Sequence, residues 1–172
     1  MKRGMILLTV LMFALAGYSQ TSAVDRLFNK YAGKDGYTTV NISRQMFELF
    51  GQMDDSSSSD DKDFKNITSK LTGIRILAYE AKDDKSVNFY QELMKDFPAS
   101  EYKELMVIKE KDQDVKFLTR EEHGRIVQLI LISGGKDNTL ICIDGDIDLK
   151  TISKLSKSMQ IEGMDKLDKI NK

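Results

Sequence analysis

The chain has 172 residues, of which 41% are hydrophobic and 31% charged, and this composition is typical of one globular domain with its own core. Its 26 basic and 27 acidic side chains nearly cancel, so the chain lacks the basic excess that a nucleic-acid partner requires. With one histidine and one cysteine, zinc centres and Cys–His catalysis are close to excluded.

Residues 1–19 predict a secretory signal peptide. Two basic residues precede an apolar run from Met5 to Ala16, and small residues follow it. The run is about 12 residues long, whereas a helix that spans a bilayer needs about 20, so we expect a cleaved leader rather than a membrane anchor. Cleavage after Ser19 and cleavage after Ala16 both fit the pattern.

The leader predicts export to the periplasm or the medium, with residues 20–172 forming one mature domain that does not span the membrane. The single cysteine, Cys142, lies far from the leader, so the chain lacks the lipid-attachment site of a lipoprotein. Because the chain has only one cysteine, it cannot form an internal disulfide, and an apolar core must hold the domain together. Cys142 lies in the run TLICID, between isoleucines, which favours a buried and unreactive thiol.

A helix, a strand and a second helix are expected at the start of the mature chain. The first helix is indicated by apolar residues at helical spacing, namely Val24, Leu27, Phe28 and Tyr31. Ser22 resembles the start of a capping box, and Gly33 can end the helix. The sequence YTTVNI predicts a strand over 37–42. Ser43 can then cap a helix over 44–53, which has a wide apolar stripe.

The middle of the chain begins with a low-complexity segment. Residues 54–63, DDSSSSDDKD, predict a mobile acidic and serine-rich surface loop, because the segment has no apolar anchors. A short helix is expected over 64–71, and GIRILAYE predicts a strand over 73–80 because its apolar residues alternate. Helical spacing returns over 86–97, and Pro98 ends that helix.

The remaining sequence is typical of four strands joined by short turns, over residues 102–110, 114–122, 125–133 and 139–147. The simplest arrangement is an antiparallel meander in which the nearly all-apolar strand over 125–133 is central. A helix after Asp148 and a last amphipathic turn after Gly163 complete the chain. We therefore predict an α+β fold: a mainly antiparallel sheet with a C-terminal four-stranded meander and helices packed on one face.

Three aspartates near the end of the last strand, Asp144, Asp146 and Asp148, raise the question of a cation site. A calcium-binding EF-hand loop starting at Asp144 would need glycine at its sixth position and glutamate at its twelfth, where this chain has Leu149 and Leu155. In the structural interpretation, the strand bends here, Asp144 and Asp146 face solvent, and Asp148 caps the following helix. The structural interpretation fits the spacing better, and weak cation binding is the alternative.

No other residue pattern indicates a reactive site, and we predict no catalytic, cofactor-binding or metal-binding residues. His123 and Gly124 fit a tight turn between two strands because both residue types tolerate the turn conformation. The segment Ser133–Asn138, SGGKDN, lacks the spacing of a phosphate-binding P-loop and precedes a strand rather than a helix, so it predicts a hairpin turn. The serine-hydrolase pattern GxSxG does not occur.

Several segments resemble, in the same order, a bacterial secreted family: LFNKYAGKDGYTTVNIS, LTGIRILAYE, FYQEL, YKELMVI, VKFLTRE, LILISGG, GDIDLKTISKL and GMDKL. This family is catalogued as domain of unknown function 4252 and is typical of Bacteroidota. The resemblance covers essentially the whole mature chain. It implies a cell-envelope protein without an assigned activity, cofactor or catalytic residue, so it supplies no site residues.

These observations favour a non-enzymatic exported module of the cell envelope that binds an unknown envelope protein or ligand. Two alternatives stay open. A hydrolase could use Asp144 or Asp146 if folding enclosed one of them beside another acid. A small-molecule or lipid carrier would need an apolar cavity of several hundred cubic ångströms between sheet and helices.

Overall fold

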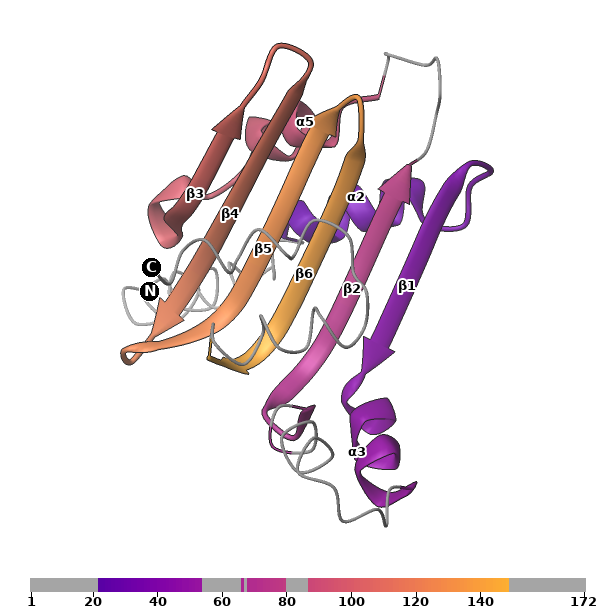
Figure 1. Cartoon of the computed structure of the whole chain (residues 1–172), viewed down its shortest axis with the longest axis vertical. Coiled ribbons are helices and arrows are strands. Elements are labelled where there is room, and N and C mark those ends of the chain that lie inside the picture. The colour runs from indigo at the N-terminus through magenta and orange to yellow at the C-terminus, as the bar shows by residue number, and fades with distance from the viewer. Residues whose placement is uncertain (1–21, 54–65, 67, 80–86, 149–172) are drawn as a thin grey trace, which may run out of the picture.

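The computed structural model describes residues 22–53, 66, 68–79 and 87–148. In this part of the chain six strands form one sheet in the order β1-β2-β6-β5-β4-β3, and every neighbouring pair is antiparallel (Figure 1). The strands are β1 (Tyr37–Ser43), β2 (Leu71–Tyr79), β3 (Lys103–Lys109), β4 (Gln113–Glu122), β5 (Arg125–Gly135) and β6 (Asn138–Ile147). The helices are α2 (Ala23–Tyr31), α3 (Arg44–Met53), α5 (Phe89–Lys95) and the short 3-10 helix η1 (Ala99–Glu101). The prediction of a mainly antiparallel α+β fold is confirmed.

The strands from β3 to β6 follow one another across the sheet, and β2 pairs with the other side of β6. The apolar strand β5 is therefore interior, as its sequence predicts. The tight turn between β4 and β5 is also confirmed, because His123 and Gly124 both have a positive φ, at 52° and 77°. The sequence predicts that Leu71 lies in a short helix, but this is wrong: Leu71 begins β2, where its side chain is buried.

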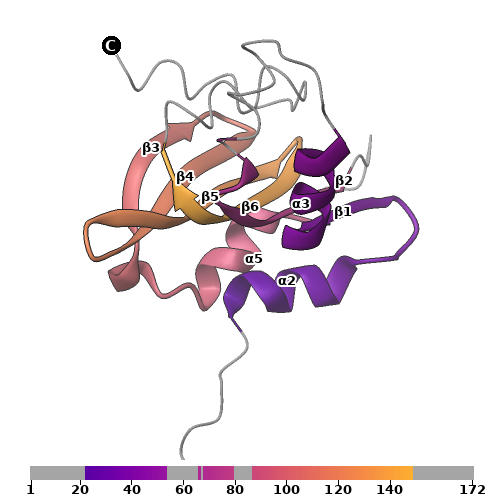
Figure 2. The ribbon, with the colours of Figure 1, turned by 90° about the horizontal axis from the view of Figure 1, so that it is seen from below.

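Helices α2 and α5 cover one face of the sheet, which we call the α2–α5 face (Figure 2). Its apolar cluster consists of Ala23, Val24, Leu27, Phe28, Tyr31, Leu77, Phe89, Leu93, Leu118, Ile130, Ile132, Leu140 and Cys142. The predicted N-cap of α2 is confirmed, since the Ser22 hydroxyl accepts a hydrogen bond from the Asp25 amide at 3.0 Å. Glu92 joins the two helices by accepting from Lys30 Nζ at 2.5 Å and from the Tyr31 hydroxyl at 2.7 Å.

The opposite face of the sheet carries a second apolar cluster, because successive side chains of a strand point to opposite faces. It consists of Phe47, Leu71, Ile74, Val115, Phe117, Leu129, Leu131, Ile141, Ile143 and Ile147. Phe47 belongs to α3, which follows β1 directly and lies on the side of the sheet opposite to α2 and α5 (Figure 2). The expectation that the helices pack on one face is therefore wrong for α3.

The N-terminus of α5 rests directly on the end of β5. The Asn88 side chain caps the helix by accepting from the Gln91 amide at 2.9 Å, and the buried Asn138 accepts from the Phe89 amide at 2.9 Å. A Cβ atom at Gly134 would lie 2.6 Å from the Tyr90 nitrogen, so only glycine leaves room for this contact. The segment SGGKDN is thus only partly a turn, because its first three residues are the last residues of β5.

Several expectations concern segments outside the described residues. They are the leader over residues 1–19, the acidic loop over 54–63, residues 64, 65 and 67 of the short helix expected over 64–71, the helix after Asp148 and the final turn after Gly163; within that short helix, Asn66 and Thr68 are helical.

Candidate functional site

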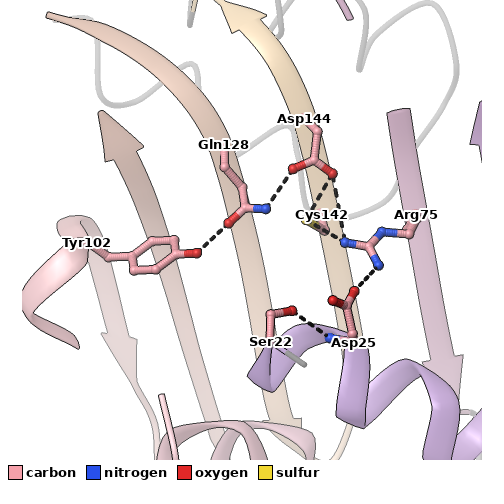
Figure 3. Close-up of polar contacts among 7 residues, drawn as sticks. All are labelled: Ser22, Asp25, Arg75, Tyr102, Gln128, Cys142 and Asp144. Carbon is pink, nitrogen blue, oxygen red and sulfur yellow. Dashed lines mark hydrogen bonds and ion pairs between the residues drawn. The ribbon is translucent and has the colours of Figure 1, made fainter. Parts of the chain in front are cut away.

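A row of polar side chains crosses the α2–α5 face beside the N-terminus of α2 (Figure 3). It runs from Tyr102 through Gln128, Asp144 and Arg75 to Asp25. Its members come from α2, from strands β2, β5 and β6, and from the residue that precedes β3. The fold thus brings together residues from five separate segments, and we take this row as the candidate site.

Arg75 lies at the centre of the row. Its Nη1 is 2.5 Å from Asp25 Oδ1 and its Nη2 is 3.8 Å from Asp144 Oδ2. The guanidinium carbon lies 5.1 Å from the centre of the Phe28 ring, close enough for a cation–π contact. Burial alone would raise the pKa of Asp25, but the hydrogen bonds with Arg75 and Ser22 outweigh it and hold the pKa below its usual value. The ion pair therefore fastens α2 to β2.

Gln128 continues the row toward β3. Its Nε2 donates to Asp144 Oδ1 at 2.6 Å, and its Oε1 accepts from the Tyr102 hydroxyl. Burial raises the pKa of Tyr102, so the phenol keeps its proton and acts as a donor at neutral pH. The Tyr102 ring packs against Phe97 with the ring centres 4.6 Å apart. The oxygen and the nitrogen of the Gln128 amide are therefore both hydrogen-bonded. The donors point in one direction along the row, from the Tyr102 phenol through Gln128 to the Asp144 carboxylate.

Cys142 lies next to two members of the row, Arg75 and Asp144. Its Sγ is 3.7 Å from Arg75 Nη2 and 3.6 Å from Asp144 Oδ2, and the residue is fully buried. Burial, reinforced by the negative charge of Asp144, raises the pKa of the thiol to about 12. The predicted burial of this thiol is confirmed, and at neutral pH it is a protonated side chain rather than a nucleophile.

The expectation that Asp144 faces solvent is wrong. Its side chain shares the α2–α5 face with Cys142, is 29% exposed, and is bound by Gln128 and Arg75 from the two flanking strands. Asp146 does lie at the surface, 49% exposed and 3.4 Å from Arg125 Nη1. The difference arises because donors from neighbouring strands are placed by sheet register, which local sequence does not reveal.

Gly145 lies within β6, which continues to Ile147, and the pairing of β2 with β6 shifts register beside it, between Leu71 and Gly73. Gly145 has φ 142°, and a Cβ there would lie 2.7 Å from the Leu71 Cα, so glycine permits the close approach of the β2 backbone. Asp148 is exposed, and the helix it was expected to cap lies outside the described residues. His123 is exposed at its turn and does not join the polar row.

Sequence reasoning missed four members of the row: Asp25, Arg75, Gln128 and Tyr102. A signal was available for two of them. Arg75 and Gln128 interrupt the apolar strands GIRILAYE and RIVQLILIS, and a polar group in such a strand needs a partner when it becomes buried. The sequence does not show which side chain pairs with Arg75 or with Gln128.

The hydrogen bonds and ion pairs of the row connect α2 with strands β2, β5 and β6. Arg75 contacts both carboxylates, so one cation on β2 links the acid of α2 to the acid of β6. Among the residues that the structure describes, no group of three or more His, Cys, Asp or Glu side chains is placed to hold a metal ion. Within the same residues, no helix combines the length and apolarity needed to cross a membrane.

The fold and the polar row define an α+β domain built on one antiparallel sheet, with apolar clusters on both faces and an internally paired set of charges. The family described as Domain of unknown function (DUF4252) matches residues 31–155, which is well over half of the chain. The chain belongs to this family, and the resemblance seen in the sequence is confirmed over residues 31–155. No curated protein and no solved structure matches the chain.

Proposed function

We propose that this chain is an exported, non-enzymatic interaction module of the cell envelope, and that it binds its partner along the β1 edge of the sheet. Export is supported by the leader pattern of residues 1–19. Binding at β1 is supported by a difference between the two edges of the sheet, and this difference is the observation that carries the proposal.

The β3 edge has the features that normally prevent further strand pairing. It carries Lys103, Glu104 and Lys109, and its pairing with β4 shifts register between Glu104 and Met106. Charged side chains and bulges of this kind discourage the addition of another strand.

The β1 edge has none of these features. Its sequence YTTVNIS contains neither a charge nor a proline, and it pairs with β2 over seven consecutive residues without a register shift. On its other side it pairs with no strand of the described part of the chain. Residues 38–41 are exposed, including Val40 at 38%. An uncharged, regular edge of this kind is suited to accept an added strand.

The two alternative functions have less support. A carboxylate hydrolase would need an unpaired acid beside a second acid, whereas Asp144 is bound by Arg75 and Gln128 and Asp146 lies near Arg125. A carrier would need an apolar cavity. Two depressions lined by described residues are instead bordered by charged side chains: one of about 240 Å³ between α2 and α5, and one of about 660 Å³ near the β4–β5 turn.

Site-specific photocrosslinking tests the interaction proposal. A benzophenone amino acid replaces Val40 on β1 or, as a matched control, Val107 on β3, which is 40% exposed. In cells that produce the full chain, we expect a discrete crosslinked product from position 40 and none from position 107. Equal crosslinking at both positions, or none at position 40, would contradict binding at the β1 edge.

Export is tested separately by the N-terminus of the protein recovered from the envelope. Mass spectrometry should find a mature chain that begins at Gln20 or at Gly17. Recovery of the uncleaved chain from the cytoplasm would contradict export without bearing on the β1 edge.

A further inference from the structure

We infer that the partner at the β1 edge is a second copy of this chain, paired antiparallel through β1 about a twofold axis that passes between the two Val40 residues. The inference rests on the proposed function, because it names the partner of the same edge. The product is a continuous sheet of two copies in which each contributes the same surface.

The sequence of β1 is compatible with itself in this register. Val40 lies opposite Val40 of the second copy, Thr38 opposite Ile42, and Thr39 opposite Asn41. In β1, Val40 and Ile42 share the face of Ile76 and Ile74, which they oppose in the β1–β2 pair, while Thr39 and Asn41 point to the α2–α5 face. Apolar and β-branched side chains therefore meet on one face and hydrogen-bonding side chains meet on the other. No like charges are brought together.

The distribution of exposed apolar side chains points to the same edge. Among the side chains whose burial the structure describes, four large hydrophobic ones are exposed: Val40, Met46, Leu49 and Val107. Three of them lie on β1 or on α3, which continues from the end of β1 (Figure 1). Antiparallel pairing places the start of α3 in one copy beside the residues that precede β1 in the other. A second copy would thus approach the region where the exposed apolar surface is concentrated.

The charged β3 edge explains why assembly stops at two copies. If both edges accepted strands, β1 of one copy could pair with β3 of the next, and such head-to-tail contacts produce open fibres. Lys103, Glu104 and Lys109, with the register shift in β3, oppose that pairing. One open edge and one protected edge together give a closed twofold dimer.

Disulfide trapping tests the register directly. In an antiparallel pair, opposite Cα atoms lie about 4.5–5.5 Å apart, which is within the range that a disulfide spans. The mature full-length Val40→Cys protein is treated with the thiol oxidant diamide, which takes up the two hydrogens released as the S–S bond forms. We expect a covalent dimer that dithiothreitol reverses. Val107→Cys is the control, and Cys142 does not compete because it is fully buried.

Sedimentation equilibrium tests the dimer without a covalent bond. Val40→Lys places two ammonium groups opposite each other and should raise the dimer dissociation constant about tenfold or more. Val107→Lys, at a position of similar exposure on β3, should leave the dissociation constant unchanged. Circular dichroism melts of both variants check that each monomer is folded.

The outcomes separate this inference from the proposed function. A wild-type dimer that Val40→Lys weakens selectively, with trapping at Val40→Cys, supports the second copy as partner. A strictly monomeric wild-type protein overturns the inference. In that case, a photocrosslink from position 40 to a different protein would retain the β1 edge as a binding surface, and its absence would remove both.

Discussion

The contact between Gly134 and the start of α5 gives the sharpest test of the fold. In the Gly134→Ala variant, the new Cβ would lie 2.6 Å from the Tyr90 nitrogen, 2.7 Å from the Tyr90 Cβ, and closer still to Asn88 Oδ1. Ordinary contacts of carbon atoms are about 3.5–4.0 Å. The first turn of α5 must therefore move by roughly 1 Å away from β5.

This movement disturbs two hydrogen bonds at the start of the helix. The Asn88 cap is worth about 1 kcal/mol. Separation of the Phe89 amide from Asn138 leaves a buried donor unpaired, which costs about 1–3 kcal/mol. Replacing glycine also lowers the conformational entropy of the unfolded chain, which stabilises the folded protein by about 0.4–1 kcal/mol and partly offsets these losses. We expect Gly134→Ala to lower the free energy of unfolding by about 2–3 kcal/mol.

Urea denaturation monitored by circular dichroism measures this change. The matched control is Gly73→Ala in β2, where the new Cβ would be 3.6 Å from the Ile42 carbonyl oxygen, an ordinary contact. We expect the control to stay within about 1 kcal/mol of the wild type. Faster amide hydrogen exchange at Phe89 in Gly134→Ala would locate the damage. Two variants of equal stability would refute the role assigned to Gly134.

Three further predictions concern individual side chains. Because burial raises the pKa of Cys142 to about 12 from an ordinary value of 9.0, its alkylation by iodoacetamide at pH 8 should be about a thousandfold slower in the folded protein than in urea; equal rates would contradict the burial. Asp25→Asn should lower the free energy of unfolding by about 1 kcal/mol at pH 7. The pKa of Asp25 is lower in the folded protein than in the unfolded chain, so its stabilisation is present above the unfolded pKa and is lost as the pH falls through the folded pKa. Urea titrations at several pH values should therefore show the difference between wild type and Asp25→Asn beginning to shrink below about pH 4. Thr119→Val should raise the melting temperature, because the buried Thr119 hydroxyl has no hydrogen-bond partner in the described structure and its removal should gain about 1 kcal/mol; a lower melting temperature would indicate a partner.

The strands of the sheet could be predicted because each has a recognisable pattern in its own local sequence. Alternating apolar residues, β-branched side chains and short turns place β1 and β3 to β6 within a few residues of their observed bounds. Leu71 was misassigned because apolar residues at 64, 67 and 71 also fit a short helix, and such short patterns are ambiguous. The face of the sheet on which α3 packs depends on the direction that the chain takes as it passes from β1 into α3. That direction is set by tertiary packing and cannot be derived from the local sequence.

The polar row was much less predictable than the sheet. Asp25 and Arg75 are 50 residues apart in the sequence, and Gln128 and Asp144 are 16 apart. Their contact depends on the register of β2, β5 and β6, and a shift by one residue would send each side chain to the other face. The apolar run TLICID indicated correctly that Cys142 would be buried. The local pattern around Asp144 suggested solvent because it contains no information about the neighbouring strands.

The position of α2 has a consequence for the order in which the chain folds. This helix is synthesised before the rest of the described structure, yet the side chains that fasten it, Arg75 and Glu92, follow 50 or more residues later. Contacts of such high sequence separation form slowly, because the intervening chain must first be brought together. We therefore expect the first helix to dock only after β2 and α5 are in place.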